Sequence, residues 1–151
     1  MGFFDLVFEE KWKFEEQDTS LNAEEAFAAI AIAVSAVDDS IDDVEIDNIV
    51  TYLRRMRLFR EYETQHFVAL FERLLRLLHQ EGPEQLAELA QEALPETLRP
   101  TAFALSLDVA LADGVITDEE KKMIQHLRIT LNIDEELALK IADVMLIKNR
   151  G

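Results

Sequence analysis

Apolar side chains recur every three to four positions from residue 22 onward, which is the period of an amphipathic α-helix. No stretch alternates between apolar and polar residues for long enough to predict a strand. Seven separate apolar stripes follow this pattern. They begin at Phe27, Ile46, Phe67, Leu86, Ala102, Met123 and Leu137. We therefore expect an all-α protein, a compact bundle of about seven helices whose apolar faces pack together.

Composition supports one helical domain. The chain has 151 residues and is 49% hydrophobic, and its 4 glycines and 3 prolines are too few for the turns of an all-β protein. The Gly82-Pro83 pair separates the third helix from the fourth, and Asn22 with Glu25 predicts a capping box before the first. We assign residues 1–21 to an N-terminal apolar arm or short helix, and residues 22–151 to the helical domain.

The charge and the cysteine count exclude several function classes. The net charge of −16 repels phosphate backbones, so we expect no nucleic-acid binding, and cations or basic partners are the natural ligands. The chain has no cysteine, which rules out disulfides, thiolate metal sites and cysteine catalysis and fits a cytoplasmic protein. No segment reaches the ~20 apolar residues of a spanning helix, and the apolar start lacks the features of a secretory signal. We expect no direct membrane insertion.

An offset of 75 residues aligns the chain with itself without gaps. It places Asp38 on Asp113, Ile41 on Ile116 and Glu45 on Glu120, and in the flanking helices it places Val34 on Val109 and Ile49 on Ile124. The simplest interpretation is an internal repeat of one helix–turn–helix unit, arranged about a pseudo-twofold axis. Each copy contributes a helix, an acidic corner and a second helix, and the corners are Asp38–Glu45 and Asp113–Glu120.

Helix capping alone can explain the glutamates of the two corners. Thr117 with Glu120, and Asp42 with Glu45, fit the capping-box pattern at the start of a helix. Gly114 suits the left-handed position that follows a helix end. These residues therefore have a structural explanation that needs no ligand.

Asp38 and Asp113 need a different explanation. Each follows the end of a helix, where a carboxylate lies against the negative end of the helix dipole at a cost of roughly 0.3–1 kcal/mol. A backbone amide of the next helix, a bound cation or a partner could offset this cost. An all-oxygen ligand set favours Ca²⁺, Mg²⁺ or Mn²⁺. The corners do not have the residue spacing of an EF-hand, so ligands would have to come from more than one segment.

No other motif points to catalysis. Glu63 and His66 have the E-x-x-H spacing of di-iron helices, but the required second copy is absent, and a surface histidine is the simpler interpretation. Asp108 lies in an otherwise apolar helix and could either extend the acidic cluster or lie at the bundle rim. The chain contains no phosphate-binding glycine loop, nucleophile elbow or zinc-protease motif. We expect no enzymatic activity.

The second corner with its flanks, Leu111–Glu120, resembles the signature of the TerB-like family, and Val37–Glu45 resembles that family's degenerate first copy. The likeness covers roughly residues 22–147. It implies a cytoplasmic helical bundle without known catalysis, linked to tellurite resistance and stress response. It also implies a divalent-metal site at the corners, formed by Asp38, Asp42, Glu45, Asp113 and Glu120.

The family likeness leaves the partner open. A protein partner is expected, either a membrane-associated protein or a second copy of this chain. The alternative is a purely structural interaction module without a metal site, in which an apolar bundle face and the N-terminal aromatic residues form the interface. Those aromatic residues are Phe3, Phe4, Phe8, Trp12 and Phe14.

Overall fold

A computed structural model describes residues 19–37, 40–112 and 114–150. The predicted arm, residues 1–21, lies outside this part of the chain except for residues 19–21, and Asp38 and Asp113 also lie outside it. Within the described ranges there are six α-helices and no strand, which confirms the all-α prediction. The helices are α2 (Ala23–Ser35), α3 (Asp43–Arg54), α4 (Thr64–Ala93), α5 (Arg99–Leu111), α6 (Asp118–Thr130) and α7 (Glu135–Lys148). Two short 3₁₀ turns, Arg57–Phe59 and Glu96–Leu98, precede α4 and α5.

The long helix α4 spans two of the helices predicted from the sequence. Gly82 lies inside it with non-helical backbone angles (φ +84°, ψ 165°), and Pro83 follows. A positive φ is readily adopted only by glycine, so the chain bends here and continues as a helix. The sequence correctly placed a break at Gly82-Pro83, although the two segments join with no intervening loop.

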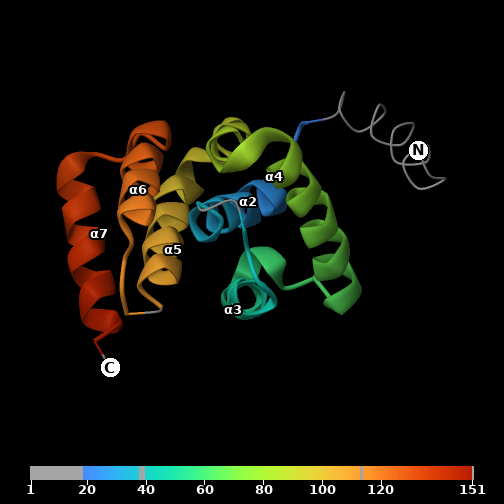
Figure 1. Ribbon diagram of the computed structural model, residues 1–151, viewed down its shortest axis with the longest axis horizontal. Coiled ribbons are helices and arrows are strands. Elements are labelled where there is room, and N and C mark those ends of the chain that lie inside the picture. Colours follow the sequence, from blue (N-terminus) through green and yellow to red (C-terminus); the bar gives the residue numbers. More distant parts are fainter. Residues whose placement is uncertain (1–18, 38–39, 113, 151) are drawn as a thin grey trace.

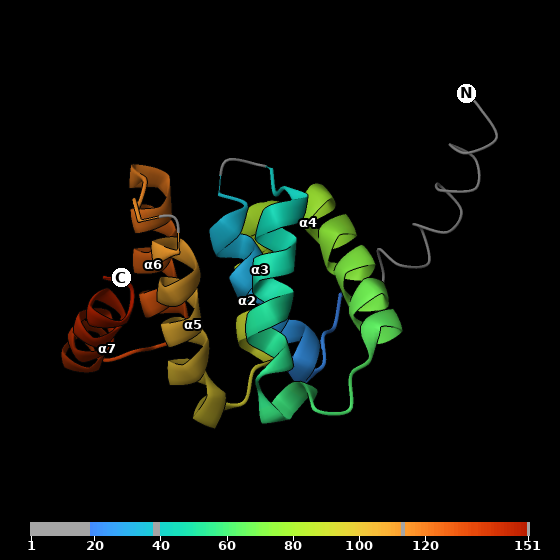
Figure 2. The same ribbon diagram turned by 90° about the horizontal axis from the view of Figure 1, so that it is seen from below.

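Helix α2 is the centre of the molecule. Its nine consecutive residues Ala26–Val34 are all buried, and it packs mainly against α4 and α5. Figure 1 shows α2 between α4 on one side and α5, α6 and α7 on the other, and Figure 2 shows α3 lying along it. A helix that is apolar on all sides is stable only where neighbours cover every side, which is the case here.

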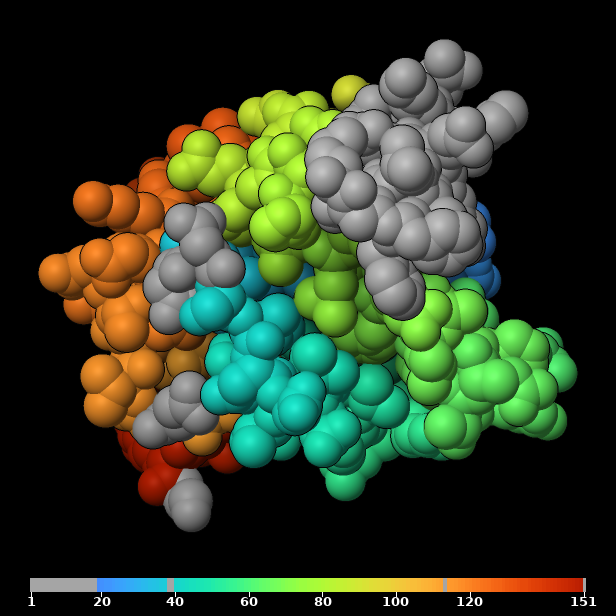
Figure 3. Space-filling model, turned by 45° about the vertical axis from the view of Figure 1, so that its right-hand side comes forward, coloured from blue at the N-terminus to red at the C-terminus, as the bar shows by residue number. Residues whose placement is uncertain are grey.

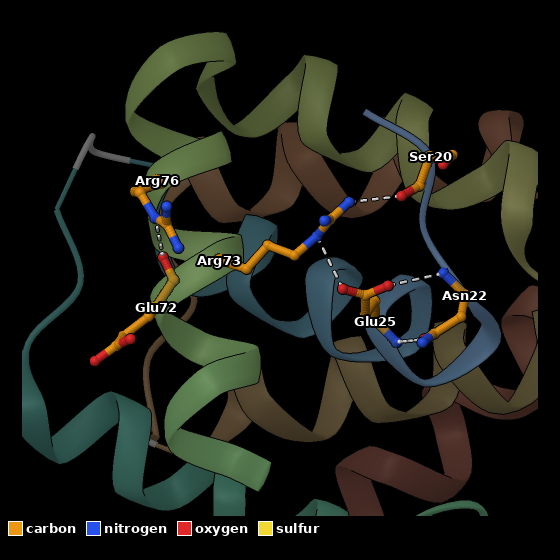
Figure 4. A network of polar contacts seen from close by, with 6 residues as sticks. All are labelled: Ser20, Asn22, Glu25, Glu72, Arg73 and Arg76. Carbon is orange, nitrogen blue, oxygen red and sulfur yellow. Dashed lines mark hydrogen bonds and ion pairs between the residues drawn. The ribbon is translucent and has the colours of Figure 1, made fainter. Parts of the chain in front are cut away.

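Polar contacts fix the start of α2 against α4. The predicted capping box is present: the Asn22 side chain accepts a hydrogen bond from the Glu25 N–H at 2.8 Å, and Glu25 Oε1 accepts one from the Asn22 N–H at 3.0 Å. Arg73 of α4 forms an ion pair with the other oxygen of Glu25, at 2.9 Å, and donates to the Ser20 carbonyl at 2.6 Å. Figure 4 shows Arg73 reaching across to this helix start. The cap and the ion pair share one carboxylate, so the register of α2 against α4 is fixed.

The outer helices frame this centre. Figure 3 shows α3 and α4 side by side on one face, with the α6 region along the other edge. None of the helices in the described ranges is long and apolar enough to cross a membrane. At the far edge, α7 packs mainly on α5. Asp134 occupies the N-cap position of α7, but its side chain makes no capping hydrogen bond.

Candidate functional site

The first corner ends at a capping box that begins α3. Asp42 has extended backbone angles, and its Oδ1 accepts a hydrogen bond from the Glu45 N–H at 2.8 Å. In return the Asp42 N–H donates to Glu45 Oε1 at 3.3 Å. The two side chains thus satisfy two backbone donors that have no partner within the helix. The capping prediction for Glu45 is confirmed.

The second corner repeats this arrangement at the start of α6. Gly114 has φ +79°, as predicted for the residue after a helix end, and its N–H donates to the Leu111 carbonyl at 2.9 Å. Thr117 Oγ1 accepts from the Glu120 N–H at 3.1 Å, and Glu120 Oε1 accepts from the Thr117 N–H at 3.0 Å. The capping prediction for Glu120 is confirmed as well, and each glutamate is held in one orientation.

The two corner glutamates converge on one small cavity. Glu45 from α3 and Glu120 from α6, both half-buried, line the same space, which has a volume of about 20 Å³. About one water-sized occupant fits in a volume of this order. The remaining lining residues come from α2, α3 and α5. They are Ser35, Asn48, Tyr52, Val109 and Ala112. The lining residues thus come from four helices, and each polar side chain among them carries an oxygen atom that could bind a cation.

An ion pair between buried Asp108 and half-exposed Lys148 lies beside Tyr52 of this cavity. Asp108 of α5 is only 7% exposed, and its carboxylate contacts Lys148 Nζ at 3.1 Å and accepts from Asn149 Nδ2 at 2.8 Å. Lys148 Nζ also lies 5.9 Å from the centre of the Tyr52 ring, within cation–π range. Asp108 is therefore buried rather than exposed at the rim, and the predicted extension toward Asp113 lies outside the described residues. Asp108 anchors the last turn of α7 to α5.

The surroundings of Tyr52 disfavour its ionisation. Burial raises the pKa of the Tyr52 phenol above its ordinary value, and the negative charge of Asp108 raises it further. Lys148 and Arg55 act in the opposite direction but are outweighed. Tyr52 is therefore a neutral hydroxyl at ordinary pH and can donate or accept a hydrogen bond in the cavity wall.

The five predicted metal ligands fall into three groups. The structure brings Glu45 and Glu120 together, whereas Asp42 is exposed at its N-cap and does not line the cavity. Asp38 and Asp113 lie outside the described residues. Across residues 19–37, 40–112 and 114–150, no three His, Cys, Asp or Glu side chains are grouped so that they could hold a metal ion. Any cation site must therefore use neutral oxygens, or the two remaining aspartates.

Sequence reasoning missed several residues of the cavity wall. Asn48 and Tyr52 follow Glu45 by three and seven positions, which places all three on one face of α3. That spacing could have identified them. No comparable signal pointed to Ser35, or to the pairing of Asp108 with Lys148 forty positions later.

The Glu63–His66 spacing has a local explanation. The Glu63 N–H donates to His66 Nδ1 at 2.9 Å at the start of α4. The ring of His66 also lies against Tyr62, with 5.6 Å between ring centres. This histidine caps a helix start, as a side chain with a free ring nitrogen can. The E-x-x-H pattern is therefore accounted for without a metal.

Comparison with known families shows to which family the chain belongs. The family model described as "Tellurite resistance protein TerB" matches residues 24–141, which is most of the chain. The chain belongs to the TerB family. The matched segment of this TerB-family protein runs from α2 into α7 and includes both corners and every residue of the cavity wall. None of the curated proteins and none of the solved structures compared with it gives a significant match.

Proposed function

We propose that this TerB-family protein is a non-enzymatic binding protein that holds a divalent cation between its two acidic corners. One observation carries the proposal: Glu45 in the first turn of α3 and Glu120 in the first turn of α6 line one cavity of about 20 Å³. Two carboxylate-bearing residues beside one small space make its potential negative, which attracts a cation.

The chemistry of the cavity wall favours a hard cation. Carboxylates of Glu45 and Glu120, the amide oxygen of Asn48 and the hydroxyls of Ser35 and Tyr52 are all oxygen ligands. Ca²⁺, Mg²⁺ and Mn²⁺ prefer such ligands, whereas Zn²⁺ and Cu²⁺ favour nitrogen or sulfur. The capping hydrogen bonds use Oε1 of each glutamate. They hold each carboxylate in place without neutralising it.

The aspartates of the corners complete the proposed ligand set. Asp38 and Asp113 occupy equivalent positions in the sequences of the two corners, 75 residues apart, and Asp113 directly precedes Gly114. Asp42 is the third acidic residue of the first corner and would add negative charge near the site. Weak affinity is expected, because the ligands come from separate segments.

The two corners are proposed to be copies of one unit. Both contain a capping box at the start of the second helix, at positions 75 residues apart, and the two units meet at one cavity. This supports an internal pseudo-twofold repeat. Helix α4, which has non-helical backbone angles at Gly82, is proposed to correspond to the third and fourth helices predicted from the sequence.

The biological role proposed here follows from the family. Membership supports a part in tellurite resistance or a related stress response, in the cytoplasm and together with a protein partner. A cation between α3 and α6 would stiffen the corners and change the surface that a partner meets. Binding of this kind needs no general base or nucleophile, in keeping with a non-enzymatic role.

Calorimetric titration of the metal-free full chain with Ca²⁺, Mg²⁺ and Mn²⁺ tests the proposal. Glu45→Gln combined with Glu120→Gln is the most informative variant, because glutamine still completes a capping box but contributes no charge. We expect affinity to fall at least about tenfold, with little loss of stability in the absence of metal. Asp38→Asn with Asp113→Asn should weaken binding in the same way.

A charge-matched control separates the effect of the corner glutamates from the effect of the overall negative charge of the protein. Glu88→Gln with Glu92→Gln removes two exposed acids from α4, far from the corners in sequence, and should leave affinity within about twofold because screened surface charges act weakly. No heat and no change in melting temperature at millimolar metal would overturn the proposal. If the control and the corner variants lose cation affinity equally, then cations bind by non-specific attraction to the negative surface and not at the corners.

The second candidate function is an interaction module without a metal site. The exposed apolar side chains of α7 favour it, since they suit a protein interface better than open solvent. This alternative predicts that the corner variants change neither cation binding nor partner binding. It also predicts that substitutions on α7 abolish association while the corners remain intact.

A further inference from the structure

The outermost helix, α7, exposes an unusual amount of apolar surface. Nine large hydrophobic side chains are exposed in the described part of the chain, and five of them belong to this one helix. They are Leu137 (39% exposed), Leu139 (61%), Val144 (56%), Leu146 (48%) and Ile147 (61%). Figure 1 shows α7 at the edge of the molecule, and none of the other helices α2–α6 lies on its outer side. Single exposed apolar residues are ordinary, but a cluster along one helix marks a contact surface.

The exposed residues lie on faces of α7 that do not pack against the core in the described part of the chain. Helix α7 packs through Ala138, Ile141, Ala142 and Met145, which follow helical spacing. At 100° per residue, the opposite side carries a stripe of Glu136, Lys140, Asp143 and Ile147. Leu139 and Leu146 flank this stripe on one side, and Leu137 and Val144 flank it on the other. The outer surface of α7 is therefore a polar stripe between two apolar rows.

The charges on the outer surface of α7 are complementary between two copies of the helix that run antiparallel. Lys140 and Asp143 lie on either side of the midpoint of the helix. Lys148, in the last turn, is already paired with Asp108 of the same chain. If a second α7 runs antiparallel, Lys140 of each copy lies opposite Asp143 of the other. The apolar rows then meet as well, Leu139 against Leu146 and Leu137 against Val144.

We propose that α7 is a self-association helix, which pairs antiparallel with α7 of a second copy of this chain about a twofold axis level with Ile141 and Ala142. A twofold interface repeats every contact, so one Lys140–Asp143 pair implies a second. Within one chain Lys140 pairs with Glu136 at 3.4 Å, with both side chains largely exposed. Such an exposed pair is weak and competes little with the intermolecular contact.

The local charge selects a second copy over other occupants. The whole chain carries −16, which opposes self-association, but residues 134–150 hold four acidic and three basic side chains and are nearly neutral. This is where two copies repel each other least. An anionic lipid surface fits poorly, because a helix lying on such a surface needs a basic polar stripe, whereas Glu136 and Asp143 make this one acidic in part.

The surface also extends beyond the part of the chain that the family model matches. That match ends at residue 141, and Val144, Leu146 and Ile147 follow it. Part of the proposed interface therefore lies outside the matched segment. The interface does not depend on the cation site, so either proposal can fail without the other.

Analytical ultracentrifugation of the full chain over a wide concentration range tests the interface. We expect a reversible monomer–dimer equilibrium that Leu139→Glu with Leu146→Glu weakens at least about 100-fold, since these changes bury charge in the contact. Val68→Glu is the matched control: Val68 of α4 is 53% exposed and lies outside α7, so its substitution should leave dimerisation unchanged. Circular dichroism checks that every variant is folded.

A charge-exchange experiment tests the antiparallel register. Lys140→Asp places acids at both central positions, and Asp143→Lys places bases at both, so each variant alone should dimerise at least about tenfold more weakly. Mixing the two variants should restore dimerisation, because each charge then meets its opposite in the other chain. A wild-type chain that stays monomeric to about 1 mM overturns the proposal.

The remaining outcomes are equally decisive. A dimer that survives the two leucine substitutions uses another surface, which also overturns the proposal. If the mixture dimerises no better than each variant alone, the antiparallel register is wrong. If the chain stays monomeric but floats with anionic phospholipid vesicles, and loses this binding on substitution of Leu139 and Leu146, then a membrane surface occupies α7 instead.

Discussion

Helices α2 and α7 are both rich in apolar residues, yet they occupy opposite environments. In α2 nine consecutive residues are buried, whereas in α7 Ala138 alone is fully buried. The apolar residues of α2 are largely alanines, which let neighbouring helices approach closely from every side. Those of α7 are mostly leucine, isoleucine and valine, which project further and remain exposed. Apolar content therefore indicates that a helix needs contacts, while side-chain size and position in the bundle determine whether the same chain supplies them.

Truncating one large side chain in each helix should give the largest contrast. Phe27→Ala removes a fully buried ring that contacts Phe59, with 6.5 Å between ring centres, and should lower the free energy of unfolding by about 3–5 kcal/mol. Leu139→Ala should change it by less than about 0.5 kcal/mol in the monomer, because Leu139 is 61% exposed. Urea denaturation at low protein concentration measures both. Similar losses in the two variants would show that α7 is as closely packed as α2.

Removing the anchor of α7 should have an intermediate and local effect. Lys148→Met leaves the buried Asp108 carboxylate without its cationic partner, although Asn149 still donates to it. A loss of about 1–3 kcal/mol is expected for a hydrogen-bonded charge that loses one partner. Hydrogen exchange should become faster in α7 and stay slow in α2. Exchange that rises equally in both helices would mean that the two unfold as one unit.

The pH dependence of Tyr52 gives the smallest effect and reports on the same anchor. Its folded-state pKa is raised, chiefly by burial and then by Asp108, so the associated stability is fully present below about pH 10 and decreases as the pH rises through the folded pKa. Asp108→Asn should lower this pKa, and Lys148→Met should raise it further. Ultraviolet titration in a Tyr62→Phe background isolates the signal, since the chain has two tyrosines. Shifts in the same direction for both variants would contradict this account.

Much of the fold could be predicted because its signals are local. Helical periodicity, the capping boxes at Asn22, Asp42 and Thr117, and the left-handed Gly114 all depend on residues a few positions apart. The complete burial of α2 was not predicted, because an apolar stripe was identified where the whole helix is apolar. Nor was the continuity of α4, because glycine and proline together usually end a helix.

The candidate site was predictable in part for the same reason. Glu45 and Glu120 were identified from the repeated corner, but their meeting at one cavity depends on where α3 and α6 lie in the bundle. The pairing of Asp108 with Lys148 joins residues forty positions apart. Contacts of this kind depend on how α7 lies against α5, and no pattern within either helix encodes that.

Tyr52 contributes to two regions at once, since it lines the cavity between the corners and faces Lys148 in the last turn of α7. Two binding equilibria of one protein are reciprocal. If a ligand in the cavity changes the affinity of α7 for a second copy by some factor, then pairing of α7 changes the affinity for that ligand by the same factor. The phenol of Tyr52 would be the physical link in such a coupling. The ultraviolet absorbance of Tyr52 would then report both events: the filling of the cavity and the pairing of α7 with a second copy of the chain.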